Sequence, residues 1–89
     1  MRCILAVIGT DKPGIIAAVS GLLAEHRINI IEISQTVMDG NFTMIMSVDL
    51  SGGDLDFSAL LDECRALGDR SGVAIHLQHE GIFNARHRI

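Results

Sequence analysis

The spacing of hydrophobic residues along the chain predicts four strands and two helices. An unbroken apolar run from Cys3 to Ile8, bounded by Gly9, is typical of a central strand covered on both faces or nearly so, over about residues 2–9. Residues 13–26 then show the three- and four-residue spacing of an amphipathic helix. Its stripe consists of Ile15, Ile16, Val19, Leu22, Leu23 and His26. We expect this stripe to face a sheet.

The start of this helix is predicted from three residues. Thr10 and Asp11 are residue types that cap helices, and Pro13 has the fixed φ and missing N–H that suit the first helical position. We therefore expect the helix to begin at Pro13.

The middle of the chain predicts a β-hairpin. Apolar and polar residues alternate over residues 28–38 and again over 42–50, as in strands with one buried face and one wetter face. Asp39-Gly40 lies between the two stretches and is among the strongest short-range hairpin signals. The two strands should therefore be adjacent and antiparallel.

The last third of the chain predicts a second helix and a fourth strand. Apolar residues keep helical spacing from Phe57 to Leu67, and Asp54 and Asp56 precede them, where the helix dipole favours acidic side chains. Glycines between residues 68 and 72 should end the helix, and alternation resumes at residue 73.

The resulting order, βαββαβ, predicts an α+β fold of the ferredoxin-like type: a four-stranded antiparallel sheet with both helices on one face. In such a sheet the first and third strands are central, and the second and fourth are edges. We expect one domain over residues 1–80. Residues 81–89 form a C-terminal tail that should pack on the domain or on a dimer mate.

Composition narrows the function classes. The chain has 89 residues and a net charge of −4, with no Trp or Tyr, so it offers neither the basic surface nor the aromatic platforms that nucleic-acid binding requires. Its apolar runs are too short to span a membrane, and we expect a soluble, cytoplasmic protein. Cys3 and Cys64 stand alone, without metal-ligand spacing, so no metal and no other cofactor is predicted.

No motif in the chain indicates catalysis. An acylphosphatase-type enzyme needs an arginine in the first strand-to-helix loop, where this chain has only Lys12 as a cation, and a copper carrier needs two thiols there. The serines and histidines form no recognisable nucleophile motif. We therefore expect a protein that is not an enzyme.

The loop Gly9-Thr10-Asp11-Lys12-Pro13-Gly14 resembles the ACT domain family of small-molecule regulatory modules, whose first helix opens with a D-x-P-G turn. Arg27-Ile28-Asn29-Ile30 is similar to the family's entry into the second strand. Residues 32–40 and 82–89 resemble the small stand-alone ACT proteins of bacteria and archaea, which are similar to the ACT half of the glycine cleavage system transcriptional repressor. The resemblance covers nearly the whole chain.

The resemblance implies an amino-acid-like ligand at the first loop and the second strand. Pro13 fixes the helix entry, and Gly14 leaves the N–H groups of the first turn open to a carboxylate. Asp11 could accept from an ammonium group, and Asn29 offers both a donor and an acceptor. The candidate ligand-binding residues are Asp11, Lys12, Pro13, Gly14, Ile15 and Asn29. Local capping remains the alternative role of the loop and of Asn29.

The second strand is predicted to be a dimer seam. An edge strand exposes unpaired backbone groups, and two such strands can pair into one continuous sheet. The candidate interface residues are Ile31, Glu32, Ser34, Gln35 and Thr36. The alternative is that this strand simply presents a solvent face.

Together these features predict a homodimeric regulatory module that senses an amino acid or related metabolite and signals to a regulatory or enzyme partner protein. The alternative is a dimeric interaction module of the same fold that binds no ligand. A small hydrolase of the acylphosphatase type is the third and weakest hypothesis.

Overall fold

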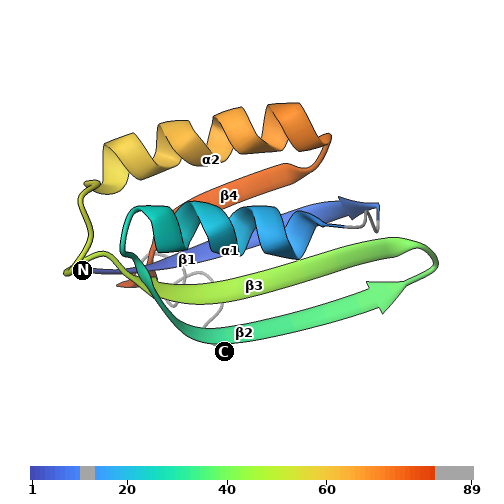
Figure 1. Cartoon of the computed structure of the whole chain (residues 1–89). Helices are drawn as coiled ribbons and strands as arrows, with labels where there is room; N and C mark the ends of the chain where they lie inside the picture. The colour runs from blue at the N-terminus through green and yellow to red at the C-terminus, as the bar shows by residue number, and fades with distance from the viewer. Residues whose placement is uncertain (11–13, 82–89) are drawn as a thin grey trace.

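A computed structural model describes residues 1–10 and 14–81 of the chain (Figure 1). The elements are β1 (Arg2–Thr10), α1 (Ile15–Glu25), β2 (Asn29–Met38), β3 (Asn41–Asp49), α2 (Phe57–Ser71) and β4 (Ala74–His79). The strands form one antiparallel sheet in the order β2-β3-β1-β4. The predicted βαββαβ order is confirmed, with β1 and β3 central and β2 and β4 at the edges.

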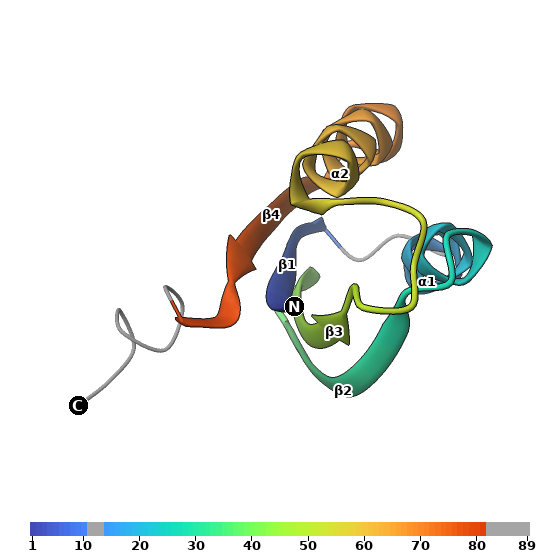
Figure 2. The same cartoon turned by 90° about the vertical axis from the view of Figure 1, so that its left-hand side faces the viewer.

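Both helices lie on the same side of the sheet, and the core fills the space between these two layers (Figure 2). The alternation of β3 decides which of its side chains enter the core. Phe42, Met44, Met46 and Val48 point to the helices and are at most 2% exposed, whereas the intervening residues point to the other face. On the helix side, α2 contributes the buried residues Leu60, Cys64 and Leu67 to this core.

The hairpin between β2 and β3 is the predicted one. Asp39 and Gly40 have φ angles of 52° and 77°, and Met38 pairs with Asn41 directly across the two-residue turn. Two successive residues with positive φ give a turn whose twist matches the strands. The turn thus sets the register of the two strands as far as the pair Glu32 and Ser47, beyond which the register shifts.

The predicted start of α1 is wrong by two residues. The helix begins at Ile15, and its N-cap is Gly14, which has a left-handed φ of 86° and makes no side-chain capping hydrogen bond. Asp11, Lys12 and Pro13 lie outside the described residues. A residue that needs positive φ suits glycine, which carries no Cβ penalty there. A glycine cap therefore replaces the predicted start at Pro13.

The start of α2 follows the usual capping chemistry. Asp56 is the N-cap, and its carboxylate accepts a hydrogen bond of 2.8 Å from the backbone N–H of Ala59. At the other end Gly72, with a φ of 70°, donates its N–H to the carbonyl of Gly68. Asp54 and Asp56 were expected near this helix start because of the helix dipole, and the structure shows that Asp56 is also the N-cap, whereas Asp54 contacts His26.

The expectation that β2 has one buried face is also wrong. Ile33 and Val37 point to the helix side of the sheet, as predicted, yet they are 49% and 57% exposed. Two causes are visible in Figure 1: β2 has a neighbouring strand on one side only, and the β2–β3 hairpin projects beyond the start of α1. The alternation of apolar and polar residues along one strand does not show how much of that strand a helix covers.

The second face of β1 is not covered by either helix. Ile4, Ala6 and Ile8 alternate with core residues and point away from α1 and α2, and the exposed fraction rises from 9% at Ile4 to 46% at Ile8. The expectation that β1 is covered on both faces or nearly so therefore holds at Ile4, which is buried, and fails toward Ile8. We call this side the open face of the sheet.

Candidate functional site

The first candidate position is the N-terminus of α1. Gly14 is exposed, a Cβ added to it would meet no other atom within 4 Å, and the first turn of the helix contains no acidic residue. The partial positive charge of the helix start is thus not neutralised by the helix itself. Ile15, the next predicted site residue, is only 5% exposed and belongs to the core. Its side chain anchors the helix start, so only its backbone could serve a ligand.

The second candidate position, Asn29, lies at the opposite end of α1. It is the first residue of β2, it pairs with Asp49 on β3, and it is exposed. Between Gly14 and Asn29 stands a helix of 11 residues, which at 1.5 Å per residue measures about 16 Å. One chain therefore does not bring the two predicted ligand contacts together.

The predicted dimer residues all lie on the outer strand. Ile31 is the extra residue of a bulge between Ile30 and Glu32, which resets the alternation of β2. Glu32, Ser34 and Thr36 then share the open face, and Gln35 points to the helix side. Except for half-buried Ile31, all of these side chains are exposed.

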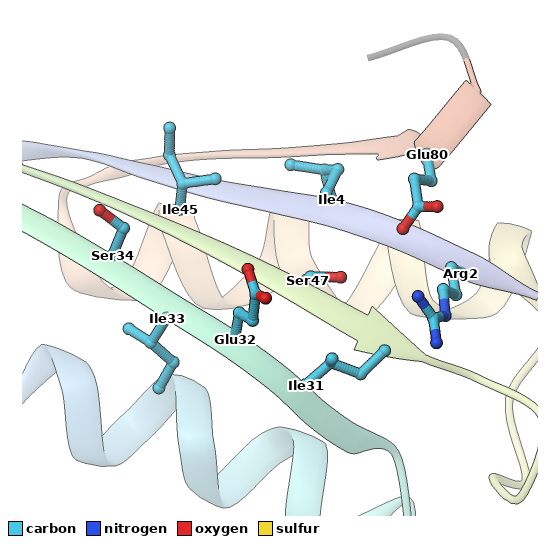
Figure 3. Close-up of a pocket in the computed structure, with 9 residues that line it drawn as sticks. All are labelled: Arg2, Ile4, Ile31, Glu32, Ile33, Ser34, Ile45, Ser47 and Glu80. Carbon is cyan, nitrogen blue, oxygen red and sulfur yellow. The ribbon is translucent and has the colours of Figure 1, made fainter. Parts of the chain in front are cut away.

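A hollow of about 450 Å³ occupies the open face (Figure 3). Ile4, Ile31 and Ile45 supply apolar surface, and Arg2, Glu32 and Glu80 border it with charged groups. Ser34 and Ser47 complete the lining on the open face, and Ile33, whose side chain points to the helix side, borders the hollow at the strand edge. Among the described residues, no ion pair joins any of the three charged side chains to another group.

A second hollow of about 260 Å³ continues the first along the sheet. It shares Ile4 and Ile45 with the larger one and extends past Ile8 to the edge strand β4. Neither hollow was predicted from the sequence. The signal was present in the unalternated run Cys3–Ile8, because such a run is apolar on both faces and only one face meets the helices.

A histidine with two acidic neighbours joins three segments at one end of the molecule. Nδ1 of His26, the C-cap of α1, lies 2.9 Å from a carboxylate oxygen of Asp54, and Nε2 lies 3.5 Å from Glu63 on α2. The two carboxylates approach opposite ring nitrogens, so they hold the ring in place. This arrangement stabilises the fold, and no nucleophile accompanies it in the part of the chain that the structure describes.

Both cysteines are core residues. Cys3 and Cys64 are free thiols with at most 1% exposure. Burial raises the pKa of Cys3 and raises the pKa of Cys64 to about 11, so both stay protonated at neutral pH. In residues 1–10 and 14–81 no three His, Cys, Asp or Glu side chains gather as metal ligands would.

Asp49, the last residue of β3, is a further perturbed carboxylate. The Ser51 hydroxyl and the Ser51 backbone N–H both donate to Asp49, at 2.7 and 3.0 Å, and they lower the pKa of that carboxyl. These hydrogen bonds join residues two apart in the chain and belong to the local turn.

Within the described ranges, no helix is long and apolar enough to cross a membrane.

The β2-β3-β1-β4 sheet with both helices on one face defines a ferredoxin-like sheet-and-helix module, a class that hosts many functions. Comparison with family models narrows this class: residues 2–78 match the ACT domain model, and the chain belongs to the ACT domain family. The resemblance noted from the sequence is thereby confirmed.

Similar sequences and solved structures support this family assignment. The UPF0237 protein MJ1558 of Methanocaldococcus jannaschii is 48% identical, over 99% of this chain and 98% of its own length. An ACT domain protein from Streptococcus pneumoniae is 46% identical with a TM-score of 0.81, over 93% of each chain. The regulatory subunit of aspartate kinase from Thermus thermophilus is 27% identical with a TM-score of 0.65, over 86% of this chain and 50% of that one.

Proposed function

We propose that this chain is a regulatory module that binds an amino-acid-like carboxylate between two subunits and passes the bound state to a partner protein. The observation that carries the proposal is the start of α1. There, Gly14 makes no side-chain capping hydrogen bond, and the first turn of the helix itself contains no acidic residue. A carboxylate is the group that such a helix end favours.

The separation of Gly14 and Asn29 makes the proposed site a shared one. A single amino acid cannot bridge about 16 Å along α1 within one chain. When two copies of β2 pair antiparallel, the beginning of one strand lies beside the end of the other. Because β2 runs antiparallel to α1, Asn29 of a second copy then approaches Gly14 of the first. The ligand's carboxylate would bind at Gly14 and its ammonium group at Asn29 of the other copy.

The outer strand supports such pairing. Ile33, Val37 and Met38 are 49%, 57% and 68% exposed, and the neighbouring helix adds Ile16 at 41%. A long edge strand with exposed apolar side chains is otherwise a hazard, because it can template aggregation. Pairing of two β2 strands would cover both the backbone edge and these side chains. Such a dimer is isologous, with the same surface contributed by each chain.

The signalling mechanism follows from the shared site. A ligand that contacts two subunits binds one arrangement of the interface better than the other, and it shifts the equilibrium by that difference in affinity. No catalytic step is part of the proposal. A similar fold occurs in the regulatory subunit of an aspartate kinase, which is consistent with a module that acts through a partner.

A second function, a dimeric interaction module without a ligand, is favoured by a different observation. The exposed apolar residues of α1 and β2 could hold two copies together, or hold a partner, whether or not Gly14 binds anything. Both functions share the dimer, and they differ in the ligand.

The ligand is tested by thermal unfolding of the protein with each of the twenty amino acids. Ligand at 100 times its Kd stabilises the native state by about 2.7 kcal/mol, so a true ligand raises the Tm measurably. Asn29→Ala should abolish that rise. Asn41→Ala is the matched control, because Asn41 is also an exposed asparagine that begins a strand. A rise that survives Asn29→Ala, or no rise with any amino acid, contradicts the sensor.

The dimer is tested separately by analytical ultracentrifugation. Ile33→Lys places a charge on the helix side of β2 and should yield monomers. Ala74→Lys places the same charge on the other edge strand, β4, and should leave the mass unchanged. If the unmodified protein sediments as a monomer, or if only the β4 variant dissociates, the proposed seam is wrong.

A further inference from the structure

The open face of the sheet has apolar side chains that neither helix covers, with Ile4 buried, Ala6 half-buried and Ile8 46% exposed. β1 is apolar on both faces, but both helices lie on one side, which leaves Ile4, Ala6 and Ile8 together with Ile45 of β3 on the other. Two adjoining hollows of about 450 and 260 Å³ run over these residues. A surface of this kind on a small domain is a candidate docking site for another segment or another chain.

The C-terminal segment that follows the last described residue starts next to this surface. Glu80, just after β4, lines the larger hollow, and Gly81 is the last described residue. Each residue spans at most about 3.3–3.6 Å, so three residues carry the chain at most about 11 Å from Glu80. Neighbouring strands are about 4.8 Å apart, so this reach extends from β4 over β1 to β3.

The composition of residues 82–89 matches the surface. The segment contains apolar Ile82, Phe83 and Ile89, and it contains Arg86 and Arg88 without any Asp or Glu. The net charge of −4 therefore divides into +2 on this segment and −6 on the rest of the chain. The larger hollow offers apolar surface between two carboxylates that no described side chain pairs, Glu32 and Glu80.

We propose that residues 82–89 dock on the open face of their own chain, with Phe83 over Ile4 and Ile45 and the basic end directed to Glu32 on β2. Arg86 is six residues from Glu80, a reach of about 20 Å, and β2 lies three strand spacings, or about 14 Å, from β4. The segment thus spans the sheet. It covers the second face of β1, and its basic side chains meet a carboxylate that is otherwise solvated.

A double-mutant cycle on the full chain tests the contact. Phe83→Ala, Ile45→Ala and the double variant are compared by thermal unfolding followed by circular dichroism. Residues in contact are non-additive. We therefore expect the Tm loss of the double variant to fall short of the sum of the single losses by roughly 5 °C. Ile16→Ala replaces Ile45→Ala in the control cycle, because Ile16 lies on α1, behind the sheet, and should be additive with Phe83→Ala. Additivity in both cycles overturns the proposal.

Limited proteolysis gives a second readout that does not depend on variant stability. Trypsin cleaves after Arg86, and we expect cleavage there to be about tenfold slower in the unmodified chain than in Phe83→Ala. This ratio follows if the Phe83 contact contributes one factor of ten to the docked population. Cleavage after Arg70, within α2, monitors global unfolding in the same digest. Equal rates after Arg86 in the two proteins overturn the docked segment.

Dilution distinguishes the chain's own segment from that of a second copy. The coupling between Phe83 and Ile45 should be unchanged over a hundredfold dilution, because an intramolecular contact does not depend on concentration. Coupling that disappears as the protein is diluted overturns docking within one chain and favours exchange between two. Neither result bears on Gly14 or Asn29, so the proposed sensor is tested independently.

Discussion

Gly68→Ala should destabilise the protein, although the substitution improves helix propensity. Gly68 lies in α2, where replacing glycine with alanine would ordinarily stabilise by about 1 kcal/mol. A Cβ at this position, however, would lie 2.8 Å from the carbonyl oxygen of Val73 and 3.6 Å from Cγ1 of Ile75. The Val73 carbonyl has little freedom to move, because its own N–H donates to Gly68 at 3.2 Å and β4 begins one residue later.

The size of this effect can be worked from the two opposing contributions. Forcing a methyl group against fixed backbone costs typically 1–3 kcal/mol, and a contact with a carbonyl oxygen belongs to the upper half of that range. After the propensity gain is subtracted, we expect a net loss of about 1–2 kcal/mol. A domain of this size loses about 4–8 °C of Tm per kcal/mol, so the Tm should fall by roughly 4–16 °C.

Gly21→Ala is the matched control. Gly21 lies in α1, and a Cβ there would meet no other atom within 4 Å, so only the propensity gain of about 1 kcal/mol remains. Thermal unfolding of both variants should therefore give shifts of opposite sign. A Tm of Gly68→Ala equal to or above that of the unmodified protein would refute the close approach of α2 and β4 on which the calculation rests.

Four further predictions concern a helix cap, a charge pair and two groups with shifted pKa values. Asp56→Ala removes the N-cap of α2 and should cost about 1 kcal/mol in chemical denaturation; an unchanged midpoint would contradict the cap. Asp54→Asn keeps the shape but removes the charge beside His26, and it should cost up to about 1 kcal/mol at neutral pH, with no loss expected in a protein already carrying His26→Ala. The raised pKa of Cys64 means that the unfolded chain releases this proton at lower pH than the folded one. Stability should therefore fall as pH rises from about 9 toward about 11, and Cys64→Ala should flatten that part of the curve. The lowered pKa of Asp49 acts at the opposite end. Its contribution is present above the unfolded pKa and is lost as pH falls through the folded one, so Asp49→Asn should weaken the acid dependence.

Local patterns in the sequence were sufficient to predict the strands, the helices and their order. Asp39-Gly40 specifies a two-residue turn through its own backbone preferences. The alternation of β3 follows from a strand that has the helices on one face only. The βαββαβ order then leaves few topologies, because short connections and right-handed crossovers exclude most alternatives.

Features that depend on distant parts of the chain were not predictable in this way. The exposure of Ile33 and Val37 depends on how far the hairpin projects beyond α1. The pairing of His26 with Asp54 joins residues 28 apart in sequence. The start of α1 was predicted wrongly because Pro13 gave a strong local signal, while the left-handed φ of Gly14 is a property of the folded turn.

The candidate site was predictable only in part, for a related reason. The sequence pointed to Gly14 and Asn29 separately, and no sequence pattern shows that one helix holds them about 16 Å apart. The open-face hollows were missed because their lining comes from several elements, such as Arg2 on β1, Glu32 on β2 and Glu80 after β4. Only the folded sheet brings these residues together.

The placement of Gly14 and Asn29 at opposite ends of α1 has a genetic consequence. In a symmetric dimer each ligand site would combine one of these positions from each chain, so a chain altered at Asn29 could still contribute an intact Gly14 to its neighbour. Mixing subunits that carry Asn29→Ala with subunits altered only at Gly14 would then produce heterodimers with one complete site and one doubly defective site. Two alleles that are each defective in binding alone would together restore one of the two sites in every heterodimer, or about a quarter of all sites if equally expressed chains pair at random.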